Sequence, residues 1–93
     1  NHENMLDIVA LLTDNLAKRC EKQLNIKLSF TKNVREYLVK KYADAKMGAR
    51  PLKRGIQSAI EDVLAEQILQ GKVQMGNKVT VSVKDEKVTF SVK

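Results

Sequence analysis

The spacing of apolar residues changes several times along this chain, and these changes limit the folds it can adopt. Some segments carry an apolar side chain every three or four positions, as in an α-helix with one buried face. Others alternate apolar with polar residues, as in a half-buried strand. The helical repeat covers residues 4–24, 34–42 and 51–70, and the alternating repeat covers residues 26–30, 79–83 and 88–92. The sequence therefore predicts an α-β-α-α-β-β order.

The last two predicted strands form a hairpin, with Asp85 and Glu86 between them. A two-stranded hairpin is marginally stable by itself in water. We therefore expect it to join the strand at residues 26–30 and to pack against the helices. The prediction is an α+β fold with three helices and a small three-stranded sheet, formed as a single domain by residues 1–93.

Residue types at the element ends support these boundaries. Thr31 can cap the second helix with its hydroxyl. Residues 43–48 lose the apolar repeat and are predicted to form a loop. Pro51 suits the first position of the third helix, where its missing N–H has no partner to lose. Gly71 is the expected end of that helix, because glycine readily adopts the left-handed conformation.

The third helix begins with its charges opposed to its own dipole. A helix N-terminus carries partial positive charge and favours acidic residues. Here the start carries Arg50, Lys53 and Arg54, whereas the acids appear from Glu61 onward. An anion bound at this helix start would resolve the conflict, since basic side chains and free backbone N–H groups together bind phosphate.

Arg50 has two possible roles on these grounds. Its planar guanidinium matches phosphate oxygens, so it could reach a phosphate held by another domain. Alternatively, it pairs with a nearby acid such as Asp44 or Glu36. The acids of the third helix, Glu61, Asp62 and Glu66, are interpreted as a solvated helix face with i,i+4 pairs rather than as acid–base catalysts.

The sequence offers no other set of residues for catalysis or metal binding. It has no glycine-rich phosphate loop ending in Lys-Ser/Thr, and His2 is its one histidine. Cys20 stands alone on the apolar face of the first helix, which indicates a buried, inert thiol and a reducing, cytoplasmic setting. We expect no enzymatic activity from this chain by itself, no metal, and no membrane span.

The chain carries a net charge of +6, which permits an anionic partner. A nucleic-acid-binding module is one alternative, although 4% aromatic residues argue against base stacking. A purely structural oligomerisation module is another. Nucleic acid is disfavoured because no helix face combines basic residues with polar base readers.

One run of residues is more specific than these patterns. Gly48-Ala49-Arg50-Pro51-Leu52-Lys53-Arg54 is followed by Ile56-Gln57 and by Ile60-Glu61-Asp62-Val63-Leu64-Ala65-Glu66. It resembles the C-terminal small (lid) subdomain of the second AAA+ module of Clp-type unfoldases, in the ClpC/ClpB branch. The resemblance covers essentially the whole chain, with departures at Met47 and at Gly55, where Ala is common. Gly55 within a helix should cost about 0.5–1 kcal/mol relative to Ala.

The resemblance implies a role for particular residues. Arg50 matches the sensor-2 arginine, which reaches the γ-phosphate of ATP, and Gly48 and Ala49 belong to the same motif. Ile8 and Leu12 match positions that contact the adenine. ATP, with Mg²⁺, would be bound mainly by a large subdomain that this chain lacks, so we expect the chain to be part of a longer protein.

The resemblance also implies the partners. They are the large AAA+ subdomain of the same protein, neighbouring subunits of a homohexamer, and protein substrates that are unfolded and threaded. A Clp peptidase is a further candidate partner, whereas no nucleic acid or membrane is expected.

Overall fold

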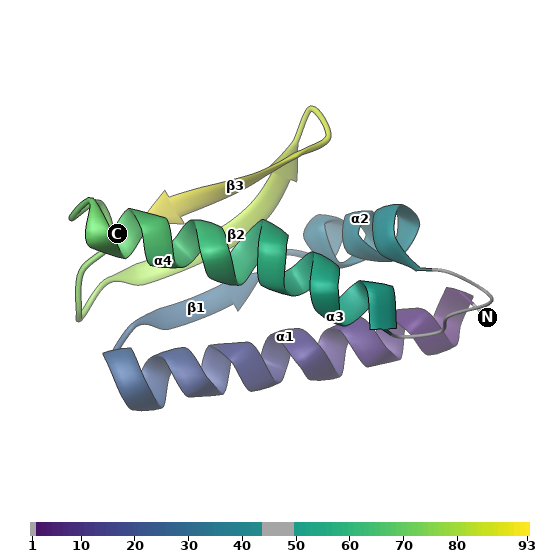
Figure 1. Cartoon of the computed structure of the whole chain (residues 1–93), viewed down its shortest axis with the longest axis horizontal. Coiled ribbons are helices and arrows are strands. Elements are labelled where there is room, and N and C mark those ends of the chain that lie inside the picture. Colours follow the sequence, from purple (N-terminus) through teal and green to yellow (C-terminus); the bar gives the residue numbers. More distant parts are fainter. Residues whose placement is uncertain (1, 44–49) are drawn as a thin grey trace.

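The computed structural model describes residues 2–43 and 50–93 of the chain (Figure 1). The elements are α1 (His2–Leu24), β1 (Lys27–Phe30), α2 (Lys32–Tyr42), α3 (Arg50–Ile56), the π-helical turn η1 (Gln57–Glu61), α4 (Asp62–Leu69), β2 (Lys78–Lys84) and β3 (Lys87–Val92). Because α3, η1 and α4 follow one another without a break, they form the third predicted helix. The predicted α+β fold and element order are confirmed.

The three strands form one sheet in the order β1-β2-β3. β1 runs parallel to β2, with Leu28 opposite Val79, and β3 runs antiparallel to β2, with Val81 opposite Phe90. The predicted joining of the hairpin to the first strand is therefore confirmed. Asp85 and Glu86 form its two-residue turn with positive φ angles of 52° and 60°, as tight hairpins require.

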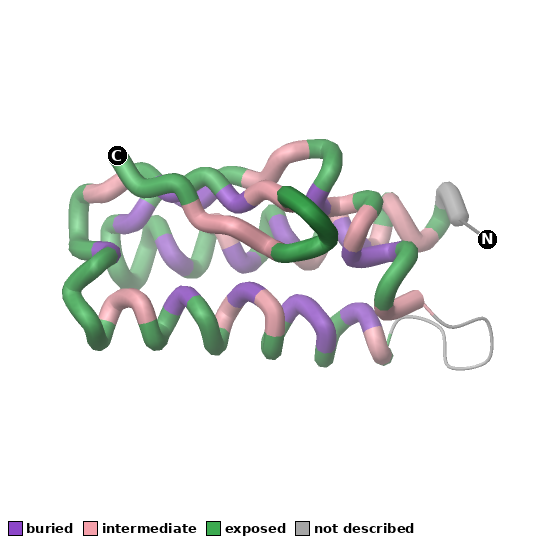
Figure 2. The backbone as a smooth tube through the Cα atoms, turned by 90° about the horizontal axis from the view of Figure 1, so that it is seen from above, coloured by how far each residue is buried: buried purple, intermediate pink, exposed green. Residues whose placement is uncertain are grey.

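The core lies between the helices and one face of the sheet. Figure 2 shows buried positions recurring along the helices, whereas the hairpin is more exposed. Fully buried side chains come from α1, α2, α3, η1 and the central strand β2, among them Val9, Leu38, Leu52, Ile60 and Val81. Thr13 is also fully buried, and its hydroxyl donates to the Val9 carbonyl at 2.8 Å, which satisfies the one polar atom of that side chain.

The observed helix ends agree with the predictions to within two residues. The Thr31 side chain accepts a hydrogen bond from the Val34 N–H, so Thr31 is the cap of α2. Gly71 follows the last helix with a φ of +78°, as predicted. The third helix begins at Arg50 rather than at Pro51. Pro51 therefore lies in the first turn of α3, where a backbone N–H would have no partner within the helix.

The π-helical turn η1 was not predicted, and the spacing of the buried residues explains it. The buried side chains of this helix recur at every fourth position from Leu52 through Ile60 to Leu64. An α-helix turns through about 400° in four residues, so such a stripe drifts by about 40° at each step. A π-turn holds an extra residue and so rotates less per residue, which returns the later part of the stripe to the core.

Two ion pairs among the described residues tie the helices together. Arg19 of α1 donates to Glu61 of η1 at 2.7 Å, and Arg35 of α2 donates to Asp14 of α1 at 3.0 Å. Glu61 thus pairs across helices, so the predicted i,i+4 role is wrong for this residue. Glu66 does accept an i,i+4 hydrogen bond, from Gln70 at 3.2 Å.

Candidate functional site

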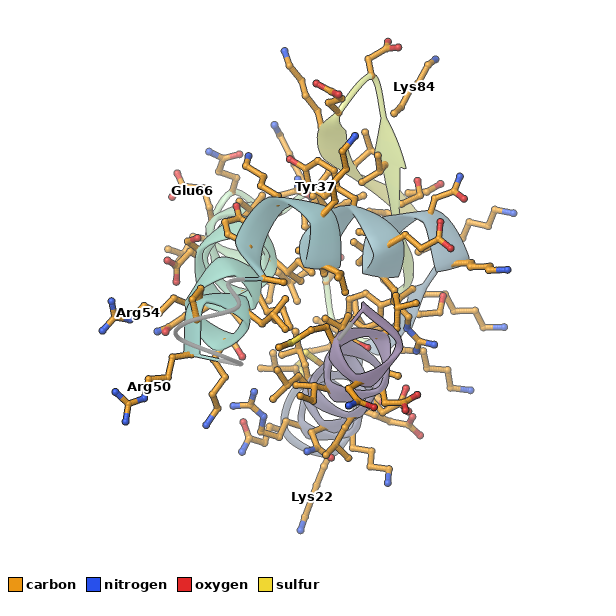
Figure 3. The ribbon with its side chains drawn as sticks, turned by 90° about the vertical axis from the view of Figure 1, so that its right-hand side faces the viewer. Lys22, Tyr37, Arg50, Arg54, Glu66 and Lys84 are labelled. Atoms are coloured by element: carbon orange, nitrogen blue, oxygen red, sulfur yellow. The ribbon has the colours of Figure 1, made fainter. Side chains whose placement is uncertain are left out.

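Arg50 stands at the start of α3 with its side chain in solvent. The residue is exposed, as are Lys53 and Arg54. Figure 3 shows Arg50 and Arg54 projecting from α3 on the same side of the molecule, away from the other helices. Residues four apart share a helix face, so these two guanidinium groups form a basic pair at the helix start.

A shallow pocket of about 280 Å³ lies beside this basic pair. Its lining residues are Tyr42, Arg50, Pro51, Arg54, Gly55 and Ser58. The end of α2 meets α3 here, because Gly55 has no side chain and the Tyr42 ring occupies the space that a Cβ would fill. The sequence had singled out Arg50 but not Tyr42 or Ser58. The four-residue spacing from Arg50 to Arg54 was the available signal for the basic pair.

Among the described residues, no acidic side chain forms an ion pair with Arg50. The first turn of α3 contains no acidic residue. Within residues 2–43 and 50–93, the ion pairs are Arg19–Glu61 and Arg35–Asp14, so Arg50 does not pair with Glu36. Asp44, the other acid considered for Arg50, lies outside the described residues. Gly48 and Ala49 also lie outside them.

Ile8 and Leu12 lie on α1, which contacts α3. Figure 1 shows the start of α3 beside the N-terminal half of α1, so these residues and Arg50 come from the same end of the molecule. Both side chains are half-buried and pack against the core. Each therefore keeps part of its apolar surface open to an additional contact, and their predicted contact with adenine stays a prediction.

The remaining candidate groups behave as structural residues. Cys20 is buried, as predicted, and burial raises the pKa of its thiol above the ordinary value. No group of histidine, cysteine and acidic side chains among the described residues could hold a metal ion. In the same part of the chain, no helix is long and apolar enough to cross a membrane.

A second pocket lies between α2 and the hairpin. Its lining includes Tyr37, Lys41, Val83 and Glu86. The Lys41 ammonium donates to the Tyr37 hydroxyl at 3.0 Å and lies 5.5 Å from the centroids of the Tyr37 and Tyr42 rings. This hydrogen bond raises the pKa of Lys41. The group is already protonated near pH 7, so the contact fixes its position rather than its charge.

Comparison with protein families shows which family the chain belongs to. Residues 1–81 match the model of the C-terminal, D2-small domain of ClpB protein. The chain belongs to the ClpB D2-small family. The resemblance that the Gly48–Arg54 run indicated is therefore confirmed for most of the chain. Membership of this family makes the chain a C-terminal domain of the Clp chaperone type.

Several curated proteins are similar to this chain in sequence. The chain is 39% identical over 92 residues to the chaperone protein ClpB of Rickettsia typhi, and this match covers 99% of the chain and 11% of the relative. It is 40% identical over 83 residues to ClpB of Aquifex aeolicus, and this match covers 89% of the chain and 8% of the relative. It is 32% identical over 83 residues to the negative regulator of genetic competence ClpC/MecB of Bacillus subtilis. This match covers 89% of the chain and 10% of the relative. The chain thus spans about a tenth of the length of these relatives.

Proposed function

We propose that this domain is the lid of a Clp-type ATP-dependent protein unfoldase and that Arg50 is its sensor-2 residue. In this proposal, a large AAA+ subdomain of the same protein binds ATP and Mg²⁺, and Arg50 contacts the γ-phosphate. The observation that carries it is the exposed Arg50 guanidinium, free of described acidic partners, at the start of a helix with no acid in its first turn. Membership of the D2-small family supports the same role.

The proposed chemistry is charge stabilisation rather than covalent catalysis. Phosphoryl transfer places negative charge on the equatorial oxygens of the γ-phosphate, and a guanidinium can stabilise that charge with two hydrogen bonds. Gly48 and Ala49 would set the approach of the chain to the nucleotide. Ile8 and Leu12, at the same end of the molecule, would contact the adenine with their open apolar surface.

The proposal extends to the assembly. A lid that contacts the γ-phosphate before hydrolysis and loses it afterwards can rotate as a rigid body about its hinge. In a cytoplasmic homohexamer, that rotation would move the neighbouring subunit and drive the threading of protein substrates. Delivery to a Clp peptidase would depend on a docking element elsewhere in the protein.

The test is Arg50→Ala in the full-length protein, with Lys53→Ala as the control. Lys53 is an exposed cation on the same helix, so its removal measures how far hydrolysis depends on the positive charge of this helix in general. We expect Arg50→Ala to lower the ATP hydrolysis rate about 100-fold or more, since charge stabilisation of this kind is worth several kcal/mol. Lys53→Ala should change it by about twofold or less.

The sensor role is wrong if Arg50→Ala hydrolyses ATP and unfolds substrates at the wild-type rate. Equal losses in both variants would also contradict it, because they would indicate a diffuse electrostatic effect. Circular dichroism of the 93-residue chain carrying each substitution checks that the fold is retained.

A further inference from the structure

The face of the sheet that points away from the helices carries lysine and hydroxyl side chains alone. Alternate residues of a strand share a face, and the buried positions of β2 are Val79 and Val81. The opposite face is therefore formed by the other set of residues in the three strands. These are Lys27, Ser29, Lys78, Thr80, Ser82, Lys84, Lys87, Thr89, Ser91 and Lys93. We call this set the lysine face.

The register arranges these side chains in rows across the strands. Lys27 is opposite Lys78, and Lys78 and Lys93 exchange two backbone hydrogen bonds of 2.9 and 2.8 Å. Three lysines thus stand side by side at one end of the sheet. Lys84 is opposite Lys87 at the other end of the sheet. Figure 3 shows Lys84 near the tip of the hairpin. The lysine face therefore has a cationic row at each end.

The hydroxyl side chains fill the middle of the lysine face. Ser29 and Thr80 lie 3.3 Å apart, and Ser82 and Thr89 lie 2.9 Å apart, as hydrogen-bonded pairs. Each hydroxyl has one proton and two lone pairs, so such pairs keep capacity for further hydrogen bonds. The middle of the face can therefore bind polar groups without adding charge.

The row of Lys27, Lys78 and Lys93 has no acid beside it in the strands, whereas Lys84 and Lys87 flank the turn acids Asp85 and Glu86. Like charges directly opposite each other on a sheet are destabilising. The described ion pairs involve neither row, and the strands themselves contain no acidic residue. Lysines on edge strands can serve to prevent strand addition. That reason does not apply to Lys78, because it lies on the central strand β2.

From this charge pattern we infer that the lysine face binds an extended acidic segment of a partner protein. Lys84 lies six positions after Lys78, which corresponds to about 20 Å along a strand. An extended peptide with acidic residues at positions about six apart would place a carboxylate at each row. Its central polar groups would then meet the Ser and Thr hydroxyls.

The composition of the face favours a polypeptide over a nucleic acid. Base stacking requires exposed aromatic rings, and the lysine face has none. Bidentate recognition of phosphate favours arginine, and Figure 3 shows Arg50 and Arg54 on a different side of the molecule from Lys84. Binding at the lysine face is therefore independent of Arg50.

The experiment measures fluorescence anisotropy of a labelled ten-residue peptide with acidic pairs at its two ends and Ser and Gly between them. The 93-residue chain is compared with two variants of equal charge. The test variant carries Lys27→Gln, Lys78→Gln and Lys93→Gln, and the control carries Lys18→Gln, Lys22→Gln and Lys40→Gln. All six lysines are exposed, so neither variant disturbs the core.

We expect the test variant to bind the peptide about tenfold more weakly and the control about twofold or less. A peptide of the same composition with its acids gathered in the centre should bind more weakly than the spaced peptide. Equal losses in both variants, or no loss in a test variant that remains folded by circular dichroism, would overturn the inference. Tighter binding of a single-stranded oligonucleotide than of the peptide, lost in the same test variant, would also overturn it.

Discussion

The Tyr42 side chain on α2 explains why position 55 of α3 is a glycine. In an exposed helix, replacing glycine by alanine stabilises the fold by about 0.5–1 kcal/mol. Here, however, an added Cβ would lie 2.7 Å from Tyr42 Cδ1, and it would also overlap two further carbons of the ring. The expectation that Gly55 merely weakens its helix is therefore wrong, because Tyr42 packs directly on it.

We predict that Gly55→Ala lowers the free energy of unfolding by roughly 1–3 kcal/mol, since overpacking outweighs the gain in helix propensity. Urea denaturation followed by circular dichroism measures the change. The same substitution in a Tyr42→Ala background should become neutral or stabilising, because the ring is gone. A loss of equal size in both backgrounds would rule out the Tyr42 contact as the cause.

Cys20 gives a prediction about pH. Burial raises the pKa of its thiol in the folded protein, so the unfolded chain loses the proton first as pH rises. The folded state then binds more protons than the unfolded state, and stability falls with increasing pH. We expect the free energy of unfolding to decrease as the pH rises above about 8.5, the ordinary pKa of a cysteine thiol. Urea titrations should show a smaller decrease for Cys20→Ala, and an identical pH slope in the two proteins would contradict this origin.

At the scale of elements, the helix formed by α3, η1 and α4 gives a prediction about its register. The π-turn places Ile60 fully inside the core, whereas Val63 remains 38% exposed. Ile60→Ala should therefore cost about 2–5 kcal/mol, since it opens a cavity. Val63→Ala should cost less than about 1 kcal/mol. Urea denaturation of both variants tests this, and similar losses would mean that the turn does not set the register.

The same helix shows how far the sequence determines this fold. Alternation and helical repeats located the helices and strands but not the π-turn η1, because burial of one face determines the spacing of apolar residues. Val63 also fits the helical repeat of residues 51–70, yet its side chain is 38% exposed. The four-residue spacing of the buried side chains from Leu52 to Leu64 was the sequence signal for the π-turn.

The site was less predictable than the fold. The charges at the helix start identified Arg50, because they conflict with a local rule. Tyr42 and Ser58 join the same pocket from positions 8 residues before and after Arg50, and only tertiary packing brings them together. The cross-helix partner of Glu61, Arg19, was missed for the same reason, since 42 residues separate the pair.

For the whole molecule, the net charge of +6 and the unpaired lysine rows predict a dependence on salt. Screening weakens repulsion between exposed like charges, so added NaCl should raise the melting temperature. At low salt, the variant lacking Lys27, Lys78 and Lys93 should melt about 2–8 °C higher than the wild type. It should also respond less to salt in calorimetry. An unchanged melting temperature at low salt would mean that the rows cost no stability.

The parallel pairing of β1 with β2 has a consequence for synthesis on the ribosome. β1 contacts a strand that begins at Lys78, so residues 31–77 must be made before the sheet can close. Until then, Leu28 and its neighbours have no strand beside them, and their apolar side chains stay open to water. A nascent chain that stalls before the hairpin emerges would expose this unfinished sheet edge, which is the kind of surface that chaperones themselves bind.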